Sequence, residues 1–137
     1  EEAFNQKLLD KQALIEQNEV RYVEEYIDDA EIVVIGFGTS GRVSQTAVTA
    51  AREQGIKVGL HRPISLYPFP EKRIEELARQ AKEILVVEMN SGQMLQDVRL
   101  AVEGVTPISF YGRMGGVIPL PDEVLEQIKN IHQGLEK

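Results

Sequence analysis

The stretch IVVIGFGTSG at residues 32–41 decides the fold. Residues 32–35 form a continuous apolar run, which is typical of a parallel strand covered on both faces. The glycine-rich string GFGTSG at 36–41 follows, and residues 42–54 then carry apolar side chains at helical spacing. A buried strand that passes through a tight turn into an amphipathic helix is the first half of a β-α-β unit.

The same alternation continues to the end of the chain. Repeated β-α-β units with short loops predict a three-layer α/β/α domain with a mostly parallel sheet, while the pattern alone leaves the strand order open. The further predicted elements are strands at 58–60, 84–87 and 108–111, a loop at 61–70, and helices at 71–83, 93–102 and from a cap at Asp122. Gly55 is expected to close the helix at 42–54.

The residues ahead of this alternation have a different pattern. Residues 1–18 read as a helix in which Phe4, Leu8 and Ile15 share one narrow apolar face. Residues 20–27 mix aromatic and β-branched side chains with acids, which is typical of an exposed edge strand. Because the chain starts with an acidic helix and without Met, we expect it to be a fragment of a longer polypeptide.

The composition is that of one globular domain, with 137 residues of which 42% are hydrophobic and 27% charged. No apolar run approaches the roughly 18 residues that a membrane span needs, so no membrane contact is predicted. The formal net charge of -7 is carried by residues 1–31, which hold ten acids and three basic residues. Lysine and arginine are not clustered anywhere, so nucleic acid is not an expected partner. The absence of cysteine excludes disulfides, thiolate-bound iron–sulfur clusters and a thiol nucleophile in this chain.

The GFGTSG string fits the GxGxxG pattern of dinucleotide-binding turns. That interpretation requires an acid at the end of the next strand to hold the ribose hydroxyls, and His61 and Arg62 stand there instead. An arginine can accommodate a 2′-phosphate, so a phosphorylated dinucleotide stays open as an alternative. A tight strand-to-helix turn is the favoured interpretation. Its amides and the following arginine could still hold an anion at the helix N-terminus, and the residues concerned are Gly36, Gly38, Thr39, Ser40, Gly41 and Arg42.

Two further loops stand out. The string EMNSGQ places Glu88, Asn90 and Gln93 at the carboxyl end of an interior strand, where α/β proteins commonly bind ligands. Glu88 could act as a base, but we favour a structural or docking role in which it bonds loop amides or caps the next helix. In the loop at 61–70, Tyr67 and Phe69 are held between prolines and are expected at a contact with another domain.

No catalytic or metal-binding set is recognisable. His61 and His132 lie far apart, no cysteine accompanies them, and Ser40 has no histidine placed by the sequence to activate it. Neither a P-loop nor a GDG-type Mg²⁺-diphosphate motif occurs in the chain. We therefore predict no catalytic residue and no metal ligand here.

Four strings taken together resemble a known family: DDAEIVVIGFGTSGRV at 28–43, LYPFP at 66–70, VVEMNSGQM at 86–94 and GRMGG at 112–116. They are similar to the α subunit of 2-oxoacid:ferredoxin oxidoreductases, particularly the 2-oxoglutarate and 2-oxoisovalerate types. The similarity is to the second domain of that subunit, which is transketolase C-terminal-domain-like, and it covers residues 20–131. Residues 1–19 look like the helical connector from a preceding domain, and residues 20–137 like the domain itself.

The resemblance implies a sheet of order 1-3-2-4-5 with the first strand antiparallel. It also implies a cytoplasmic parent enzyme that decarboxylates a 2-oxoacid with thiamine diphosphate and Mg²⁺, transfers the acyl group to coenzyme A and reduces ferredoxin through iron–sulfur clusters. In this family the β subunit binds the diphosphate and Mg²⁺, and the first domain of the α subunit binds the pyrimidine. The expected partners are the other domains of the same subunit and the β subunit, with ferredoxin reached only indirectly.

The leading hypothesis is thus a non-catalytic assembly domain of such an enzyme, without a cofactor of its own. One rival is a free-standing phosphate- or nucleotide-binding module that uses Gly36–Gly41. The other is an interaction domain without a ligand. A homodimer of the chain, formed through Phe4, Leu8 and Ile15 or through Tyr67 and Phe69, is also expected if these surfaces have no other partner.

Overall fold

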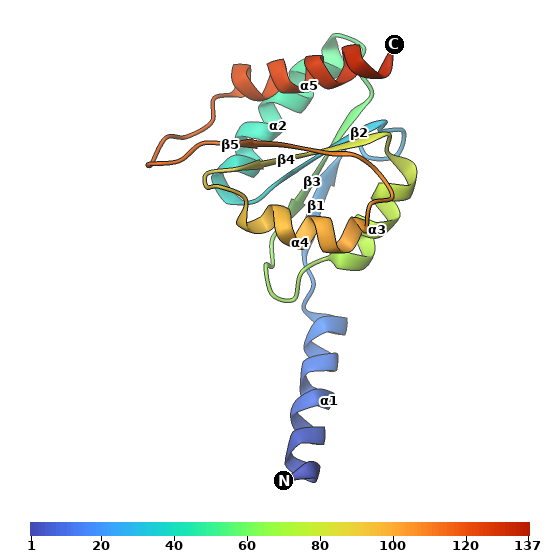
Figure 1. The fold of residues 1–137 in the computed structure, drawn as a ribbon, viewed down its shortest axis with the longest axis vertical. Coiled ribbons are helices and arrows are strands. Elements are labelled where there is room, and N and C mark those ends of the chain that lie inside the picture. The colour runs from blue at the N-terminus through green and yellow to red at the C-terminus, as the bar shows by residue number, and fades with distance from the viewer.

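A computed structural model describes all residues from Glu1 to Lys137 and contains one five-stranded sheet (Figure 1). The strands are β1 (Tyr22–Glu25), β2 (Ile32–Gly36), β3 (Val58–Pro63), β4 (Glu83–Glu88) and β5 (Ile108–Gly112). They lie in the order β1-β3-β2-β4-β5, with β1 antiparallel to β3 and all other neighbours parallel. The strand order that the family resemblance implies is therefore confirmed.

Four helices cover the two faces of the sheet, and a fifth extends away from it (Figure 1). The helices are α1 (Glu2–Asn18), α2 (Gly38–Glu53), α3 (Glu71–Gln80), α4 (Gln93–Val102) and α5 (Pro121–Leu135). Helices α2 and α5 pack on one face, and α3 and α4 pack on the other. This arrangement is the three-layer α/β/α architecture predicted from the alternation of strands and helices.

The central strand β2 explains why residues 32–35 are all apolar. Ile32 and Val34 point into the cluster under α2 and α5, whereas Val33 and Ile35 point into the cluster under α3 and α4. All four side chains are at most 1% exposed. A strand with helices on both faces has no solvent side, so polar residues have no place along it.

Several element boundaries differ from the prediction. Strand β3 continues to Pro63 because β1 pairs along it, with Tyr22 opposite Pro63, so His61 and Arg62 lie in the sheet and not in a loop. The edge strand β1 ends at Glu25, and the next residue, Tyr26, turns the chain with a φ of 55°. Helix α3 ends at Gln80, three residues early, and Glu83 already belongs to β4.

The two predicted helix caps have different outcomes. Gly55 closes α2 as predicted: it has a φ of 81°, its amide donates to the carbonyl of Arg52, and the amide of Ile56 donates to that of Ala51. The prediction for Asp122 is wrong. Leu120 takes the N-cap position with extended backbone, and Pro121 begins α5 because its fixed φ and missing N–H suit the first turn.

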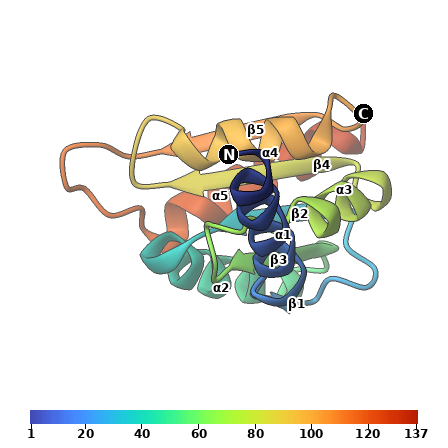
Figure 2. The same cartoon turned by 90° about the horizontal axis from the view of Figure 1, so that it is seen from below.

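Helix α1, predicted at residues 1–18, is observed at Glu2–Asn18 and extends away from the body of the domain (Figures 1 and 2). None of its residues is buried, and the side chains of Phe4 and Leu8 are 65% and 50% exposed. Ile15 is half-buried. The apolar face predicted for this helix is thus present without a neighbour, and its role as a connector stays a prediction.

Candidate functional site at the switch point of the sheet

The distinctive loops after β2 and β4 lie next to each other. From β2 the chain passes through α2 to β3 on one side, and β4 lies on the other side of β2. The crevice outside such a switch point is the usual ligand position in open α/β sheets. Here it is an open depression of about 590 Å³. Its lining comes from the start of α2, the loop after β4 and the first turns of α4, together with Leu66.

The polar residues after β4 are engaged with the start of α4. The buried carboxylate of Glu88 accepts hydrogen bonds from the amides of Met94 (2.7 Å) and Leu95 (2.9 Å). The side-chain oxygen of Asn90 accepts from the amides of Gly92 (2.8 Å) and Gln93 (3.0 Å). These four amides are the donors that a helix start leaves without intrahelical partners. The structure therefore gives Glu88 and Asn90 the capping role that we favoured, while the Gln93 side chain is exposed.

The loop after β2 is shorter than predicted, because α2 begins at Gly38 and takes in the last four residues of GFGTSG. A Cβ atom on Gly41 would lie 2.8 Å from the carbonyl oxygen of Gly36 and 2.9 Å from Nε of Arg62. Gly36 and Gly41 are thus required for close contact between strand and helix. This is the favoured interpretation, a tight strand-to-helix turn.

The anion interpretation of the same residues depends on the α2 N-terminus. Phe37 is the N-cap, and no side chain caps the helix. Thr39 and Arg42 are exposed, whereas Ser40 is only 3% exposed and borders the depression together with Gly38. Nε of Arg62 is buried without a hydrogen-bond partner. These positions leave an anion site at Gly36–Arg42 as a prediction.

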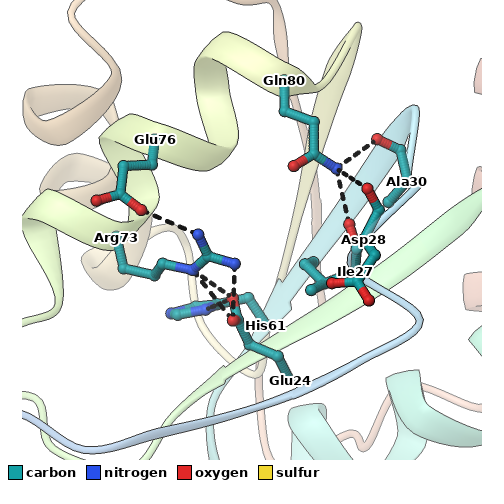
Figure 3. A network of polar contacts seen from close by, with 8 residues as sticks. All are labelled: Glu24, Ile27, Asp28, Ala30, His61, Arg73, Glu76 and Gln80. Atoms are coloured by element: carbon teal, nitrogen blue, oxygen red, sulfur yellow. Dashed lines mark hydrogen bonds and ion pairs between the residues drawn. The ribbon is translucent and has the colours of Figure 1, made fainter.

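A polar network that sequence reasoning missed joins β1, β3 and α3 (Figure 3). Nδ1 of His61, whose side chain is fully buried, lies 3.0 Å from Oε2 of Glu24. Nε of Arg73 donates to both oxygens of Glu24 at 3.0 and 3.1 Å, and a second nitrogen of Arg73 donates to Glu76 at 3.0 Å. Nε2 of His61 has no partner. A proton on Nδ1 therefore leaves only an acceptor unpaired, which is the less costly arrangement.

The network alters the titration of Glu24. Burial by itself would raise the pKa of Glu24, but the hydrogen bonds that it accepts from His61 and Arg73, together with the charge of Arg73, outweigh burial and hold this pKa below its ordinary value of 4.5. The antiparallel register of β1 against β3 sets Glu24 opposite His61. No local pattern in the sequence signals this contact, because residues 61–63 read as a loop.

The predicted interface residues of the proline loop separate in the structure. Tyr67 is 67% exposed, as expected of a contact residue. Phe69 is half-buried and packs against the core cluster under α3 and α4. Phe69 thus anchors the loop to the domain's own core, and its contact with a partner stays a prediction.

The structure has no set of residues arranged for a metal site. No group of three or more His, Cys, Asp or Glu side chains is placed to hold a metal ion. The residues present therefore do not fit Mg²⁺-diphosphate or an iron–sulfur cluster. No helix is both long and apolar enough to cross a bilayer.

The fold and the switch point define a three-layer α/β domain in which the conspicuous polar residues stabilise the start of a helix. Residues 30–124 match the family described as pyruvate:ferredoxin oxidoreductase core domain II. The chain belongs to this family, and the resemblance seen in the four sequence strings is confirmed.

Named relatives agree with this assignment. The chain is 49% identical, over 130 residues, to the ketoisovalerate oxidoreductase subunit VorB of Methanothermobacter thermautotrophicus, which covers 95% of the chain and 37% of the relative. It is 40% identical, over 103 residues, to the 2-oxoglutarate synthase subunit KorA of Methanothermobacter marburgensis, which covers 75% of the chain and 28% of the relative. The chain thus spans only about 28–37% of the length of these two curated relatives.

A solved structure has the same fold. It is the 2-oxoglutarate:ferredoxin oxidoreductase from Magnetococcus marinus with 2-oxoglutarate, coenzyme A and succinyl-CoA bound. The similarity has a TM-score of 0.82 at 23% sequence identity and covers 94% of the chain and 23% of that protein chain.

Proposed function

We propose that the chain is a non-catalytic assembly domain of a thiamine diphosphate-dependent 2-oxoacid:ferredoxin oxidoreductase. The observation that carries the proposal is the 49% identity to a ketoisovalerate oxidoreductase subunit over 95% of the chain, together with the family match of residues 30–124. The role of Glu88 at the switch point supports the non-catalytic assignment as well. Its carboxylate accepts hydrogen bonds from two amides of α4 and is therefore not free to serve as a base.

The parent enzyme would oxidatively decarboxylate a 2-oxoacid, form an acyl-coenzyme A and reduce ferredoxin in the cytoplasm. Thiamine diphosphate, Mg²⁺, coenzyme A and iron–sulfur clusters would be bound by its other domains and by the β subunit. A branched-chain 2-oxoacid is the proposed substrate, since the identity to the ketoisovalerate oxidoreductase subunit exceeds that to the 2-oxoglutarate synthase subunit.

The proposal is tested on the complete subunit co-expressed with its β subunit. We expect 2-oxoisovalerate and coenzyme A to drive ferredoxin reduction by the complex, and 2-oxoglutarate to be a poor substrate. Removing residues 20–137 should abolish co-purification of the subunits, measured by size-exclusion chromatography. A complex that assembles and turns over normally without these residues would show that they are not an assembly domain.

A second candidate function is anion binding by the loop Gly36–Arg42. The specific observation in its favour is that the uncapped first turn of α2 borders the depression at the switch point. Thermal shifts with phosphate, coenzyme A and nicotinamide dinucleotides test it. Stabilisation by phosphate or coenzyme A would support the anion site, dinucleotides are expected to have no specific effect, and no shift with any of them would favour a ligand-free interaction domain.

A further inference from the structure

Exposed apolar side chains gather where the parallel strands end. Phe37 follows β2, Leu66 and Tyr67 follow β3, and Met89 follows β4, with exposed fractions between 37% and 67%. The loops at the opposite end of the sheet present mainly charged residues such as Asp28, Lys57 and Lys82, and Tyr26 and Val105 are the large apolar side chains exposed there. Single exposed apolar residues are ordinary, but several at one edge of a small domain indicate a contact surface.

Helix α1 ends near the same edge of the sheet, because it immediately precedes β1 in the chain. Because β1 is antiparallel to β3, its first residue, Tyr22, lies opposite Pro63 at the end of β3, and α1 extends outward from there (Figures 1 and 2). A second depression, of about 830 Å³, lies between the last turns of α1 and the proline loop. It shares Leu66 and Asp97 with the depression at the switch point. The two form one concave surface, which we call the elbow.

One side of α1 faces the elbow. Ala13, Glu16 and Gln17 line the second depression. With about 100° of rotation per residue, Leu9 falls on the same side, whereas Phe4 and Leu8 fall on a different side of the helix. The elbow therefore has an apolar floor of Phe37, Leu66, Tyr67 and Met89 and one helical wall.

The charges around the elbow are mostly negative. Glu71 and Asp97 form no ion pair, and Glu16 only accepts a hydrogen bond from Gln12. Arg73 is engaged by Glu24 and Glu76, which leaves Lys72 as the free cation in the lining. A second copy of this chain would bring the same acids against these. A partner surface with an apolar centre and basic residues beside it fits better.

We propose that the elbow seats the remainder of the same subunit, through an apolar patch flanked by arginine or lysine. This inference rests on the proposed function. The relative that matches at 49% identity is nearly three times as long as the matched region, so most of such a subunit lies outside this domain. A covalently attached domain also has a high effective concentration at the elbow, which favours it over a free molecule.

The test is hydrogen exchange on the complete subunit, compared with the chain of residues 1–137 alone. Docking should slow amide exchange in residues 13–20 and 64–70 by about tenfold or more in the complete subunit. Leu66→Asp should remove that protection, because a charge is placed in the apolar floor. Leu100→Asp is the matched control, since Leu100 is 71% exposed on α4 and outside both depressions, and it should leave the protection unchanged.

A charge reversal tests the basic character of the partner. Asp97→Arg should raise exchange in the same segments at least severalfold, whereas Glu53→Arg, at the exposed end of α2, should not. Melting curves of the isolated variants establish that they fold, which is expected because all four side chains are exposed.

Two outcomes would overturn the inference. One is exchange at the elbow that is equal in the complete subunit and the isolated chain. The other is a dimer of the isolated chain that Leu66→Asp dissociates, which would make a second copy the occupant. Ferredoxin reduction by the same preparations separates this result from the proposed function: an active complex with an unprotected elbow contradicts only the inference, and an inactive complex with a protected elbow contradicts only the function.

Discussion

At the scale of single residues, Glu24 joins the edge strand to the body of the domain. Its carboxylate accepts hydrogen bonds from Arg73 on α3 and pairs with the buried ring of His61 on β3 (Figure 3). Three elements separated in sequence thus meet at one side chain. Replacing this carboxylate with an amide leaves the buried imidazole and the half-buried guanidinium with one neutral oxygen as acceptor and sets an NH2 donor against them.

The substitution Glu24→Gln should therefore lower the free energy of unfolding by about 1–3 kcal/mol. Urea denaturation of the isolated chain measures this. Glu75→Gln is the matched control, because Glu75 pairs with Arg79 on the exposed side of α3, where such a pair contributes about 0.3–0.5 kcal/mol. An equal effect of the two substitutions would show that the network does not stabilise the domain.

The same carboxylate predicts a dependence of stability on pH. The pKa of Glu24 is lower in the folded chain than its ordinary value of 4.5, so its contribution is complete above about pH 4.5. That contribution is lost as the pH falls through the lowered pKa, because the unfolded chain then binds the proton more tightly. Urea denaturation between pH 3 and pH 7 should show a smaller acid-induced loss of stability for Glu24→Gln than for the wild type.

Gly41 offers a test of the contact between β2 and α2. A methyl group there would lie 2.8 Å from a backbone carbonyl oxygen, so Gly41→Ala should destabilise the domain by about 1–3 kcal/mol. Gly134→Ala is the control, since Gly134 lies in α5 and a Cβ there meets nothing within 4 Å. That change should stabilise the chain by about 0.5–1 kcal/mol. Thermal melting of both variants is the measurement, and tolerance of alanine at both positions would contradict the required close contact.

At the scale of elements, the acids of residues 24–31 and the helix α1 differ in their contacts with the body of the domain. The acids of residues 24–31 are largely paired with the body of the domain: Asp29 with Arg52 at 2.6 Å and Glu31 with Lys82 at 3.2 Å, in addition to Glu24 with Arg73. Their negative charge is thus partly neutralised locally. Helix α1 has no comparable ties, and a lone helix of its length is marginal in water.

Replacing Phe4 and Leu8 with Ser should therefore leave the melting temperature of the β/α body unchanged. If the side of α1 that carries Phe4 and Leu8 is also the surface of a homodimer, the double variant should sediment as a lighter species than the wild type. Analytical ultracentrifugation at high protein concentration makes the comparison. A monomeric wild type would remove the basis for a homodimer through α1, and a large fall in melting temperature would contradict the independence of the helix.

At the scale of the whole molecule, the isolated chain should have no oxidoreductase chemistry. It has no cysteine and no cluster of metal ligands, and the buried carboxylate of Glu88 at the switch point caps a helix. We expect calorimetry to detect no tight binding of thiamine diphosphate, and no dye reduction with any 2-oxoacid and coenzyme A. Micromolar binding of thiamine diphosphate would contradict the assembly role.

The sequence by itself determined the alternation of strands and helices, the layers and the core. Apolar runs such as residues 32–35 and helical spacing such as Val124, Ile128 and Ile131 are local patterns, and burial of these side chains on the predicted faces follows from them. The four strings also show the family resemblance without a structure. The strand order was predicted from that resemblance and not from the alternation of strands and helices.

Only the tertiary structure decided which residues meet across the sheet. The pairing of Glu24 with His61, the packing of Phe69 on the core and the hydrogen bonds that Glu88 accepts from amides of α4 depend on strand register, loop path and helix start. A sequence pattern specifies which face a side chain occupies, but contacts between distant segments are fixed by packing of the whole domain. Helix α1 shows the reverse: the sequence predicts the helix from local spacing, but none of its residues is buried in this domain.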